Sequence, residues 1–245
     1  SEAQLPLRMG LVIDTSESVS QRFSFEQAAA TSFVRNVVTG KDDLAFVVGF
    51  SNSVLMVQDF TGEISKISEG IGKLAPAGGT ALWDAVAFAA DKLASRPEEQ
   101  PVARVLVVIS DGEDNSSNAT LKQAIEAAEH GEVAVYTVST YDFHEVATAF
   151  MESAHLGNRA LRTLAGRTGG SDFLPGSLGD LNHSLAALQQ IIHSRYLVSY
   201  KPALSNRDAQ YRTIDITARK SGHKLRVFAR KGYYFQAKDP AAGSL

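Results

Sequence analysis

Five side chains with oxygen ligands stand where apolar stretches of the sequence give way to turns or predicted helices. Asp14, Ser16 and Ser18 follow one apolar run, Thr80 lies in a Gly-Gly-Thr turn before a helical pattern, and Asp111 follows a second apolar run. Hydroxyl and carboxylate oxygens are hard ligands, which suit Mg²⁺ or Mn²⁺, with Ca²⁺ as a further choice, rather than zinc or a soft metal. The sequence therefore predicts a divalent-metal site at these five residues.

The alternative explanation is that these side chains are ordinary helix caps, because Ser, Thr and Asp are favoured at helix N-termini. Capping accounts for any one of them, but not for five oxygen donors at three junctions. Ligands of open α/β sheets bind beyond the carboxyl ends of the strands. Ser16 and Ser18 alternate, so both hydroxyls can point to one side of an extended loop. We therefore favour the metal site over the caps.

The surrounding pattern predicts the elements that bring these junctions together. Continuous apolar runs are typical of parallel strands that helices cover on both faces, and they occur at 9–13, 44–50, 105–109 and 133–138. Apolar stripes with helical spacing occur at 25–37, 64–74, 82–93, 121–128 and 181–192, the last with Asp180 as its predicted N-cap. Strands that alternate with helices predict an α/β fold with a doubly wound, mostly parallel sheet flanked by helices.

Other segments depart from this alternation. Residues 53–57 are predicted to form an antiparallel edge strand paired to 44–50, and residues 142–158 fit no clean period, which indicates a loop with a short helix. After residue 192 a period of two predicts antiparallel strands at 196–200, 211–218 and 225–230. We expect residues 1–201 to form the α/β domain and residues 202–245 its C-terminal β extension, with a disordered tail from residue 239.

Composition excludes several classes of function. The chain of 245 residues has a net charge of -3, which gives no general attraction to nucleic acid, so no nucleic-acid partner is expected. It has no cysteine, which excludes disulfides, thiolate metal sites and cysteine nucleophiles. No apolar stretch approaches the length that a membrane span needs. The first residues lack the features of a signal peptide, so we expect the chain to be a domain taken from a longer protein.

The motifs resemble those of a known family. Asp-x-Ser-x-Ser at 14–18, Gly-Gly-Thr at 78–80 and Ser-Asp-Gly at 110–112 are similar to the von Willebrand factor type A domain, also called the integrin-type I domain, over about residues 7–193. The segments 196–200 and 230–234 resemble a bacterial branch, the Acidobacteria-type VWFA-related domains. Members of that branch are usually exported, so the resemblance implies a secreted or extracytoplasmic location.

The resemblance also implies a function for the five residues. They correspond to the metal-ion-dependent adhesion site of the family, where Ser and Thr hydroxyls bind the metal directly and the aspartates act directly or through water. The metal then stays electrophilic and can accept a carboxylate from outside. The implied function is that of a non-enzymatic adhesion or assembly module, which binds an Asp or Glu of a partner protein through Mg²⁺ or a similar ion.

Two other functions stay open at this point. A phosphatase of the haloacid-dehalogenase type also begins with a strand that ends in aspartate and uses Mg²⁺, but it needs an acid two residues later, where this chain has Ser16. The chain could also be a non-enzymatic subunit of an ATPase-driven machine. The partner's identity, the physiological metal and the oligomeric state are not predicted.

The C-terminal strands have an unusual charge. Residues 201–231 contain nine Lys or Arg and two Asp, although the whole chain is acidic. The simpler interpretation, which we favour, is that these cations protect exposed strand edges from pairing with other chains. The alternative is a surface for an acidic partner.

Overall fold

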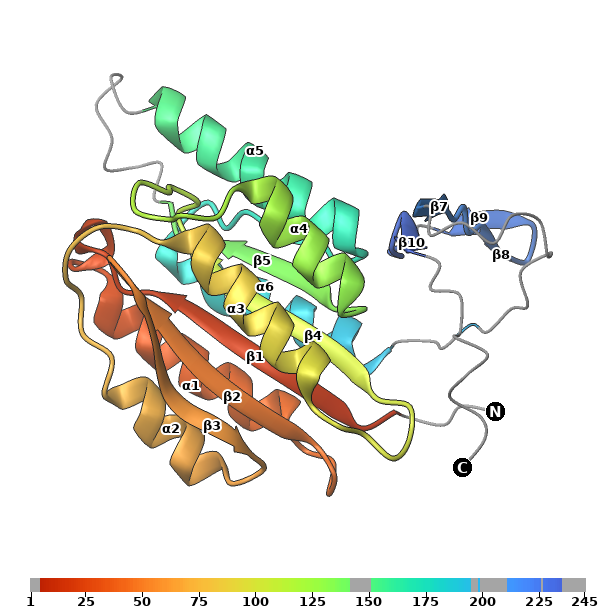
Figure 1. Cartoon of the computed structure of the whole chain (residues 1–245), viewed down its shortest axis with the longest axis horizontal. Coiled ribbons are helices and arrows are strands. Elements are labelled where there is room, and N and C mark those ends of the chain that lie inside the picture. Colours follow the sequence, from red (N-terminus) through yellow and green to blue (C-terminus); the bar gives the residue numbers. More distant parts are fainter. Residues whose placement is uncertain (1–4, 142–150, 195–197, 199–210, 226, 235–245) are drawn as a thin grey trace, which may run out of the picture.

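One central sheet organises the molecule (Figure 1). The structure is a computed structural model and describes residues 5–141, 151–194, 198, 211–225 and 227–234. Six strands lie in the order β3-β2-β1-β4-β5-β6. In chain order they are β1 (Leu7–Asp14), β2 (Leu44–Phe50), β3 (Val54–Thr61), β4 (Ala103–Ser110), β5 (Ala134–Ser139) and β6 (Asp172–Phe173). The four predicted parallel strands are confirmed, and the short β6 was not predicted.

The pairing of the strands also agrees with the sequence pattern. All neighbours run parallel except β3, which pairs with β2 antiparallel as the predicted edge strand. β1 lies in the middle of the sheet, and Ile13 is level with Ile109 of β4. The loops that follow β1 and β4 therefore leave the sheet side by side at its carboxyl edge. This register places the two aspartate-bearing loops next to each other.

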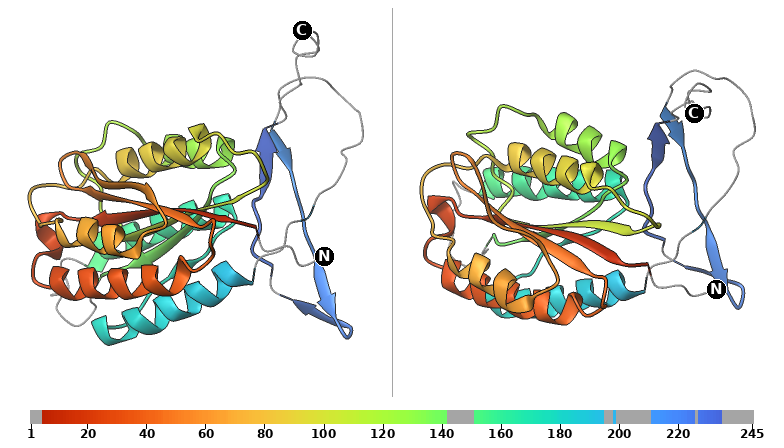
Figure 2. Two further views of the ribbon diagram at one scale, coloured as in Figure 1. Left: turned by 90° about the horizontal axis from the view of Figure 1, so that it is seen from below. Right: turned by 60° about the horizontal axis from the view of Figure 1, so that its bottom comes forward.

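Helices cover both faces of the sheet (Figure 2). The helices α1 (Phe23–Val37), α2 (Ile64–Gly72) and α6 (Leu178–His193) lie on one face, and α3 (Leu82–Ser95), α4 (Leu121–His130) and α5 (Met151–Thr168) lie on the other. A hydrophobic core lies on each face of the sheet, and successive residues of β1 point into alternate cores. Leu11 and Ile13 pack beneath α1, whereas Val12 packs beneath α3. The predicted doubly wound sheet is confirmed.

Two predictions about helices are wrong. Instead of a loop with a short helix at 142–158, an 18-residue helix α5 begins at Met151; residues 142–150 lie outside the described part. Its inner face is buried through Leu161 and Leu164 but also through Gly157 and Asn158, so the apolar stripe is interrupted in the sequence. The N-cap of α6 is Ser177, whose hydroxyl accepts the Asp180 N–H, rather than Asp180 itself.

The C-terminal strands are shorter than predicted. They form two separate pairs: β7 (Tyr211–Thr213) with β10 (Gly232–Tyr234), and β8 (Ala218–Lys220) with β9 (His223–Leu225). The predicted continuous strands at 211–218 and 225–230 are therefore wrong. The alternation at 214–218 does not face a core, since Ile216 is 38% exposed. The predicted strand 196–200, apart from Val198, the domain boundary at 201 and the tail from 239 lie outside the described residues.

The β extension attaches to the end of the domain opposite the carboxyl edge of β1 (Figures 1 and 2). Tyr211 Oη donates to Glu129 Oε1 of α4 at 3.3 Å, and Arg167 of α5 forms an ion pair with the same oxygen at 3.1 Å. Arg230 adds an ion pair to Glu132. These contacts hold β7 and β10 against the C-terminal ends of α4 and α5, at the end of the sheet opposite the aspartate loops.

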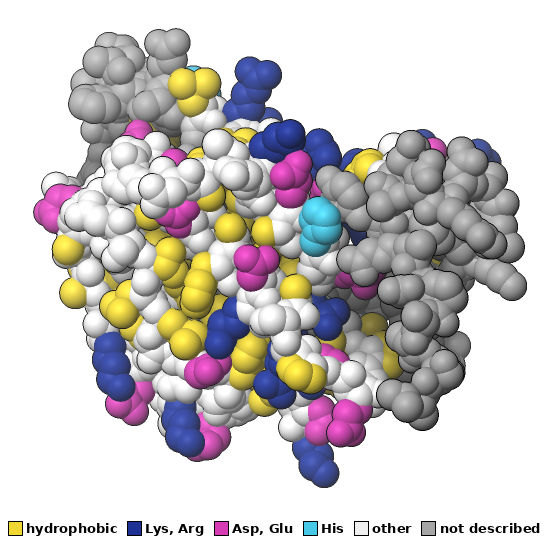
Figure 3. Space-filling view, viewed as in Figure 1, with side chains coloured by type: hydrophobic (Ala, Val, Ile, Leu, Met, Phe, Trp, Pro, Cys, Tyr) yellow, Lys and Arg dark blue, Asp and Glu magenta, His cyan; other side chains and the backbone are white. Residues whose placement is uncertain are grey.

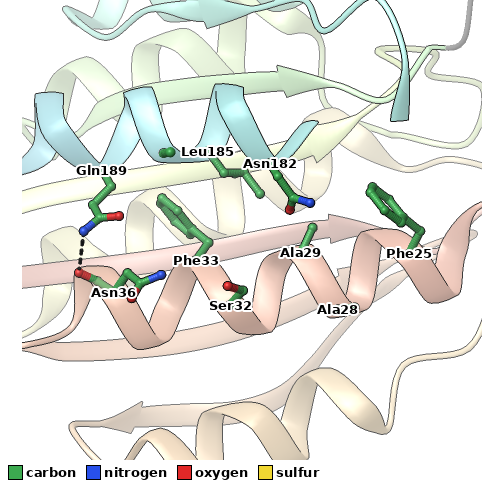
Figure 4. Close-up of a pocket in the computed structure, with 10 residues that line it drawn as sticks. Phe25, Ala28, Ala29, Ser32, Phe33, Asn36, Asn182, Leu185 and Gln189 are labelled. Carbon is green, nitrogen blue, oxygen red and sulfur yellow. Dashed lines mark hydrogen bonds between the residues drawn. The ribbon is translucent and has the colours of Figure 1, made fainter. Parts of the chain in front are cut away.

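Two features of the described surface lie apart from the predicted metal ligands. Acidic and basic side chains are interspersed on the face seen in Figure 3. A groove runs between α1 and α6, where Phe25, Phe33 and Leu185 form part of the lining and Gln189 Nε2 donates to the Asn36 carbonyl at 3.2 Å (Figure 4). None of the predicted metal ligands lines this groove. No helix in the described part of the chain has the length and apolar character needed to cross a membrane.

Candidate metal centre

Asp14 is fixed at the carboxyl end of β1 by two hydrogen bonds. Its side chain is completely buried. Oδ1 accepts the Ser16 N–H at 2.9 Å, and Oδ2 accepts the hydroxyl of Ser110, the last residue of β4, at 2.6 Å. The neighbouring strand therefore orients the carboxylate, because Ser110 lies beside Asp14 in the sheet.

A chain of hydrogen bonds joins the next three predicted ligands. Ser16 Oγ and Ser18 Oγ are 2.9 Å apart, and Ser18 Oγ donates to Asp111 Oδ2 at 2.9 Å. The sequence predicted an extended loop between the serines, and that prediction is wrong. The loop forms a 3-10 turn (η1, Glu17–Val19), and this turn brings the two hydroxyls together.

Thr80 reaches the same edge of the sheet through backbone contacts. The Glu17 N–H donates to the Gly78 carbonyl at 3.0 Å, which ties the glycine turn to the serine loop. The Thr80 N–H donates to Asn115 Oδ1 at 2.8 Å, and the Asn115 N–H donates back to the Thr80 carbonyl at 3.0 Å. Thr80 is thus held between the loop after β1 and the loop after β4, with 3% of its surface exposed.

Helix capping does not explain the five residues. In the described helices none of the five side chains caps an N-terminus: α1 and η1 have no side-chain cap, α4 is capped by Thr120 and α6 by Ser177. The start of α3 is capped from another loop, because Asp114 Oδ1 accepts the Leu82 N–H at 2.9 Å. The capping alternative raised by the sequence therefore loses its support.

The electrostatics of the cluster favour a cation. Burial, followed by the nearby Asp111 charge, raises the pKa of the Asp14 carboxyl to about 6, although hydrogen bonds from Ser110 and Ser16 act in the opposite direction. Two carboxylates beside each other in a buried place repel. The described residues contain no group of three or more His, Cys, Asp or Glu arranged to hold a metal. The candidate ligands are instead two carboxylates and three hydroxyls, a set of oxygen donors that fits a hard divalent ion.

Three residues of the site were not singled out from the sequence. Ser110 orients Asp14, Asn115 holds Thr80, and Arg22 lies 3.5 Å from Asp111 Oδ2 through its Nη2. Ser110 belongs to the Ser-Asp-Gly motif, and its position next to Asp111 in the sequence could have indicated that it lies at the site. Arg22 precedes Glu26 by four residues, a spacing that predicts an ion pair on a helix but not a contact with Asp111.

Comparison with known proteins identifies the family of this chain. The model of the von Willebrand factor type A domain matches residues 9–175, well over half of the chain. The chain belongs to the von Willebrand factor type A family. No curated protein sequence matches it, so the family model and the structures below are the comparisons that bear on it. The finer resemblance to the Acidobacteria-type branch stays a prediction.

Three solved structures with the same fold come from bacterial proteins. The vWF domain of the type V pili tip protein Mfa5 from Porphyromonas gingivalis has a TM-score of 0.62 at 15% identity, over 80% of this chain and 99% of that domain. The PilB minor pilin from Streptococcus sanguinis has a TM-score of 0.60 at 15% identity, over 82% of this chain and 64% of that one. A von Willebrand factor type A protein from Catenulispora acidiphila has a TM-score of 0.59 at 16% identity, over 77% and 42%.

These identities are low, so the likeness shows a shared fold. The chain spans less than two thirds of the PilB and Catenulispora proteins.

Proposed function

We propose that this von Willebrand factor A domain is a divalent-metal-dependent protein-binding module. Asp14, Ser16, Ser18, Thr80 and Asp111 would hold a Mg²⁺ or Mn²⁺ ion, with Ca²⁺ as a further choice, and an Asp or Glu of a partner protein would complete the coordination. The observation that carries the proposal is the hydrogen-bonded chain from Ser16 through Ser18 to Asp111, next to the buried Asp14. It gathers oxygen ligands from sequence-distant loops at the edge of the sheet where ligands bind.

Each residue has a distinct part in this proposal. Asp14 is the deepest ligand, and Ser110 and the Ser16 N–H keep its oxygens in place. The hydroxyls of Ser16 and Ser18 bond to each other and to Asp111, and they would turn toward the ion. A bound divalent ion would supply positive charge that attracts a carboxylate. Mg²⁺ prefers about six oxygen ligands, so five protein positions leave room for one from the partner.

The site supports binding better than catalysis. A phosphatase of the haloacid-dehalogenase type needs an acid at the position of Ser16, whose hydroxyl instead lies 2.9 Å from Ser18 Oγ. Catalysis would also need a positioned base or nucleophile beside the metal. We expect no turnover of p-nitrophenyl phosphate with Mg²⁺. Turnover that disappears in Asp14→Asn would contradict the proposal and favour the enzyme.

The comparisons suggest where such a module works. A pili tip protein and a minor pilin share the fold, and both names describe parts of surface appendages. We infer that this chain works outside the cytoplasm, in adhesion or in the assembly of a surface structure.

The direct test is capture of the partner from the native source with and without a chelator. Binding should disappear with EDTA and return with Mg²⁺ or Mn²⁺, and Asp14→Ala should capture nothing under any condition. The matched control is Asp91→Ala, which removes an exposed aspartate of α3. A partner retained equally with and without EDTA would show that the metal site does not bind it.

A further inference from the structure

Arg22 lies between a proposed metal ligand and a buried carboxylate. Its Nη2 is 3.5 Å from Asp111 Oδ2, and its Nε donates to Glu26 Oε1 at 3.0 Å. The Glu26 side chain is completely buried, whereas 14% of the Arg22 side chain is exposed. The guanidinium is therefore a largely buried cation whose Nε–Nη2 edge bridges Glu26 and the ligand cluster.

The helix dipole does not account for a cation at this position. Arg22 is the N-cap residue of α1, where the helix dipole disfavours positive charge. A buried carboxylate such as Glu26 is also costly unless it is paired. A reason for the pair is that the positive charge of Arg22 balances the negative charge of Asp111, which lies 89 residues away in the sequence.

The two contacts of Arg22 differ in closeness. Strong bonds between a guanidinium and a carboxylate measure about 2.7–2.9 Å. The contact with Glu26 is near this range, and the contact with Asp111 is much longer. Arg22 can therefore give up Asp111 without losing its closer partner. A cation that binds Asp111 would replace the weaker of the two contacts.

We propose that Arg22 competes with the divalent ion for Asp111 and thereby sets the metal affinity of the site. Without metal, Arg22 balances the charge of Asp111. When a metal binds, Glu26 retains the guanidinium and keeps it away from the ion. This inference rests on the proposed function and adds a control of affinity by two residues that do not touch the metal.

The proposal predicts opposite effects for the two partners. Arg22→Gln removes the competing charge and should tighten Mg²⁺ binding by about tenfold, an order-of-magnitude value for a unit charge close to the ion in a partly buried site. Glu26→Gln frees the guanidinium to move onto Asp111 and should weaken Mg²⁺ binding by about threefold on the same electrostatic scale. A pair that only stabilised α1 would make both variants weaker binders.

The experiment is calorimetric titration of the full chain with Mg²⁺ and with Mn²⁺, together with thermal unfolding in EDTA. Arg35→Gln is the matched control, because Arg35 is an exposed arginine on the same helix and its removal changes the net charge equally. We expect Arg22→Gln to unfold at a lower temperature than the wild type in EDTA and to gain more from Mg²⁺. Arg22→Lys keeps the charge and should bind within about threefold of the wild type.

The outcomes separate this inference from the proposed function. A wild-type chain that binds neither Mg²⁺ nor Mn²⁺ would overturn both. A wild-type chain that binds metal, with Arg22→Gln equal to Arg35→Gln or weaker, would overturn the inference alone. If Arg22→Gln does not fold, Glu26→Gln decides the question, and an affinity that is unchanged or higher in that variant overturns the inference.

Discussion

Asp14 is the residue on which the proposed metal centre depends, because its carboxylate is completely buried beside Asp111. Two strands orient it, since it ends β1 and accepts the Ser110 hydroxyl of β4. Such a carboxylate lowers stability when its charge is not balanced. A cation at this point would therefore stabilise the folded chain as well as create a binding site.

We expect Mg²⁺ or Mn²⁺ to raise the thermal midpoint of the wild type and to have no effect on Asp14→Ala. At a hundredfold excess over the dissociation constant, the gain is about 2.7 kcal/mol, which corresponds to roughly 5–10 °C for a chain of this size. Asp91→Ala should respond like the wild type. An equal rise in Asp14→Ala, measured by differential scanning calorimetry, would contradict the assignment of Asp14 as a ligand.

Glu26 predicts a dependence of stability on pH. Burial, together with the charge of Asp14, raises its pKa to about 7, although Arg22 acts in the opposite direction. Because the folded state holds the proton more tightly than the unfolded state, the free energy of unfolding should fall as the pH rises from about 4.5 to 7. This change is at most about 3 kcal/mol, and Asp14 contributes in the same direction.

Glu26→Gln should flatten this slope, which denaturant titrations in EDTA at several pH values between 4.5 and 7.5 would measure. The remaining slope would come from Asp14 and the other titrating groups. If Glu26→Gln keeps the full slope of the wild type, Glu26 is not the group that titrates in this range.

At the scale of elements, the loop after β4 supports the site from two directions. Gly112 has a φ of +84°, and a Cβ on it would lie 2.6 Å from the backbone carbonyl carbon of Gly157 in α5. Asp111 is thus followed by a turn that favours glycine and presses against a helix. Farther along the same loop, Asp114 and Ser117 cap the first N–H groups of α3. The loop that provides Asp111 therefore also fixes the start of the helix that follows Thr80.

Asp114→Ala should lower the free energy of unfolding by about 1–2 kcal/mol, because the Leu82 N–H loses its acceptor and the Trp83 N–H keeps only the Ser117 hydroxyl. It should also weaken Mg²⁺ binding, since Thr80 lies just before these residues. Asp114→Asn keeps an acceptor oxygen, so its free energy of unfolding and its Mg²⁺ affinity should both fall less than those of Asp114→Ala. Urea titration and calorimetry would test this, and an equal loss in both variants would mean that the charge of Asp114 matters more than the cap.

At the scale of the whole molecule, the proposed metal centre and the basic strands lie at opposite ends of the sheet (Figure 2). The hairpin of β8 and β9 places Arg219 opposite Lys224. Like charges directly opposite each other weaken a strand pair slightly, and these side chains are exposed. Edge protection remains the simpler explanation, and an acidic partner remains the alternative.

Because the two regions are far apart, we expect the charges of the hairpin to have little effect on metal affinity. The double variant Arg219→Glu, Lys224→Glu should bind Mg²⁺ within about twofold of the wild type, because charges separated by more than the Debye length of about 10 Å are largely screened. Capture of the partner from the native source should also be unchanged. A variant that binds metal normally but captures less partner would show that the basic hairpin is a second contact surface.

The sequence by itself determined the sheet, most of the helices that cover it, and the places of the five candidate ligands. These features follow from local rules. Apolar runs mark buried parallel strands, and parallel strands end at one edge, so residues that follow β1 and β4 must meet there. No knowledge of side-chain contacts was needed to predict that Asp14 and Asp111 lie close together.

Only the tertiary structure decided how the ligands are held. The turn that joins Ser16 to Ser18, the hydroxyl of Ser110 on Asp14, and the position of Arg22 between Asp111 and Glu26 depend on contacts between distant segments. Contacts between distant segments also explain why the predictions for residues 142–158 and for the C-terminal strands were wrong. The buried face of α5 uses glycine at position 157 because it packs there against the loop after β4 and not only against the sheet. The predicted C-terminal strands break because no core faces their apolar residues, and alternation in sequence cannot show whether a core is present.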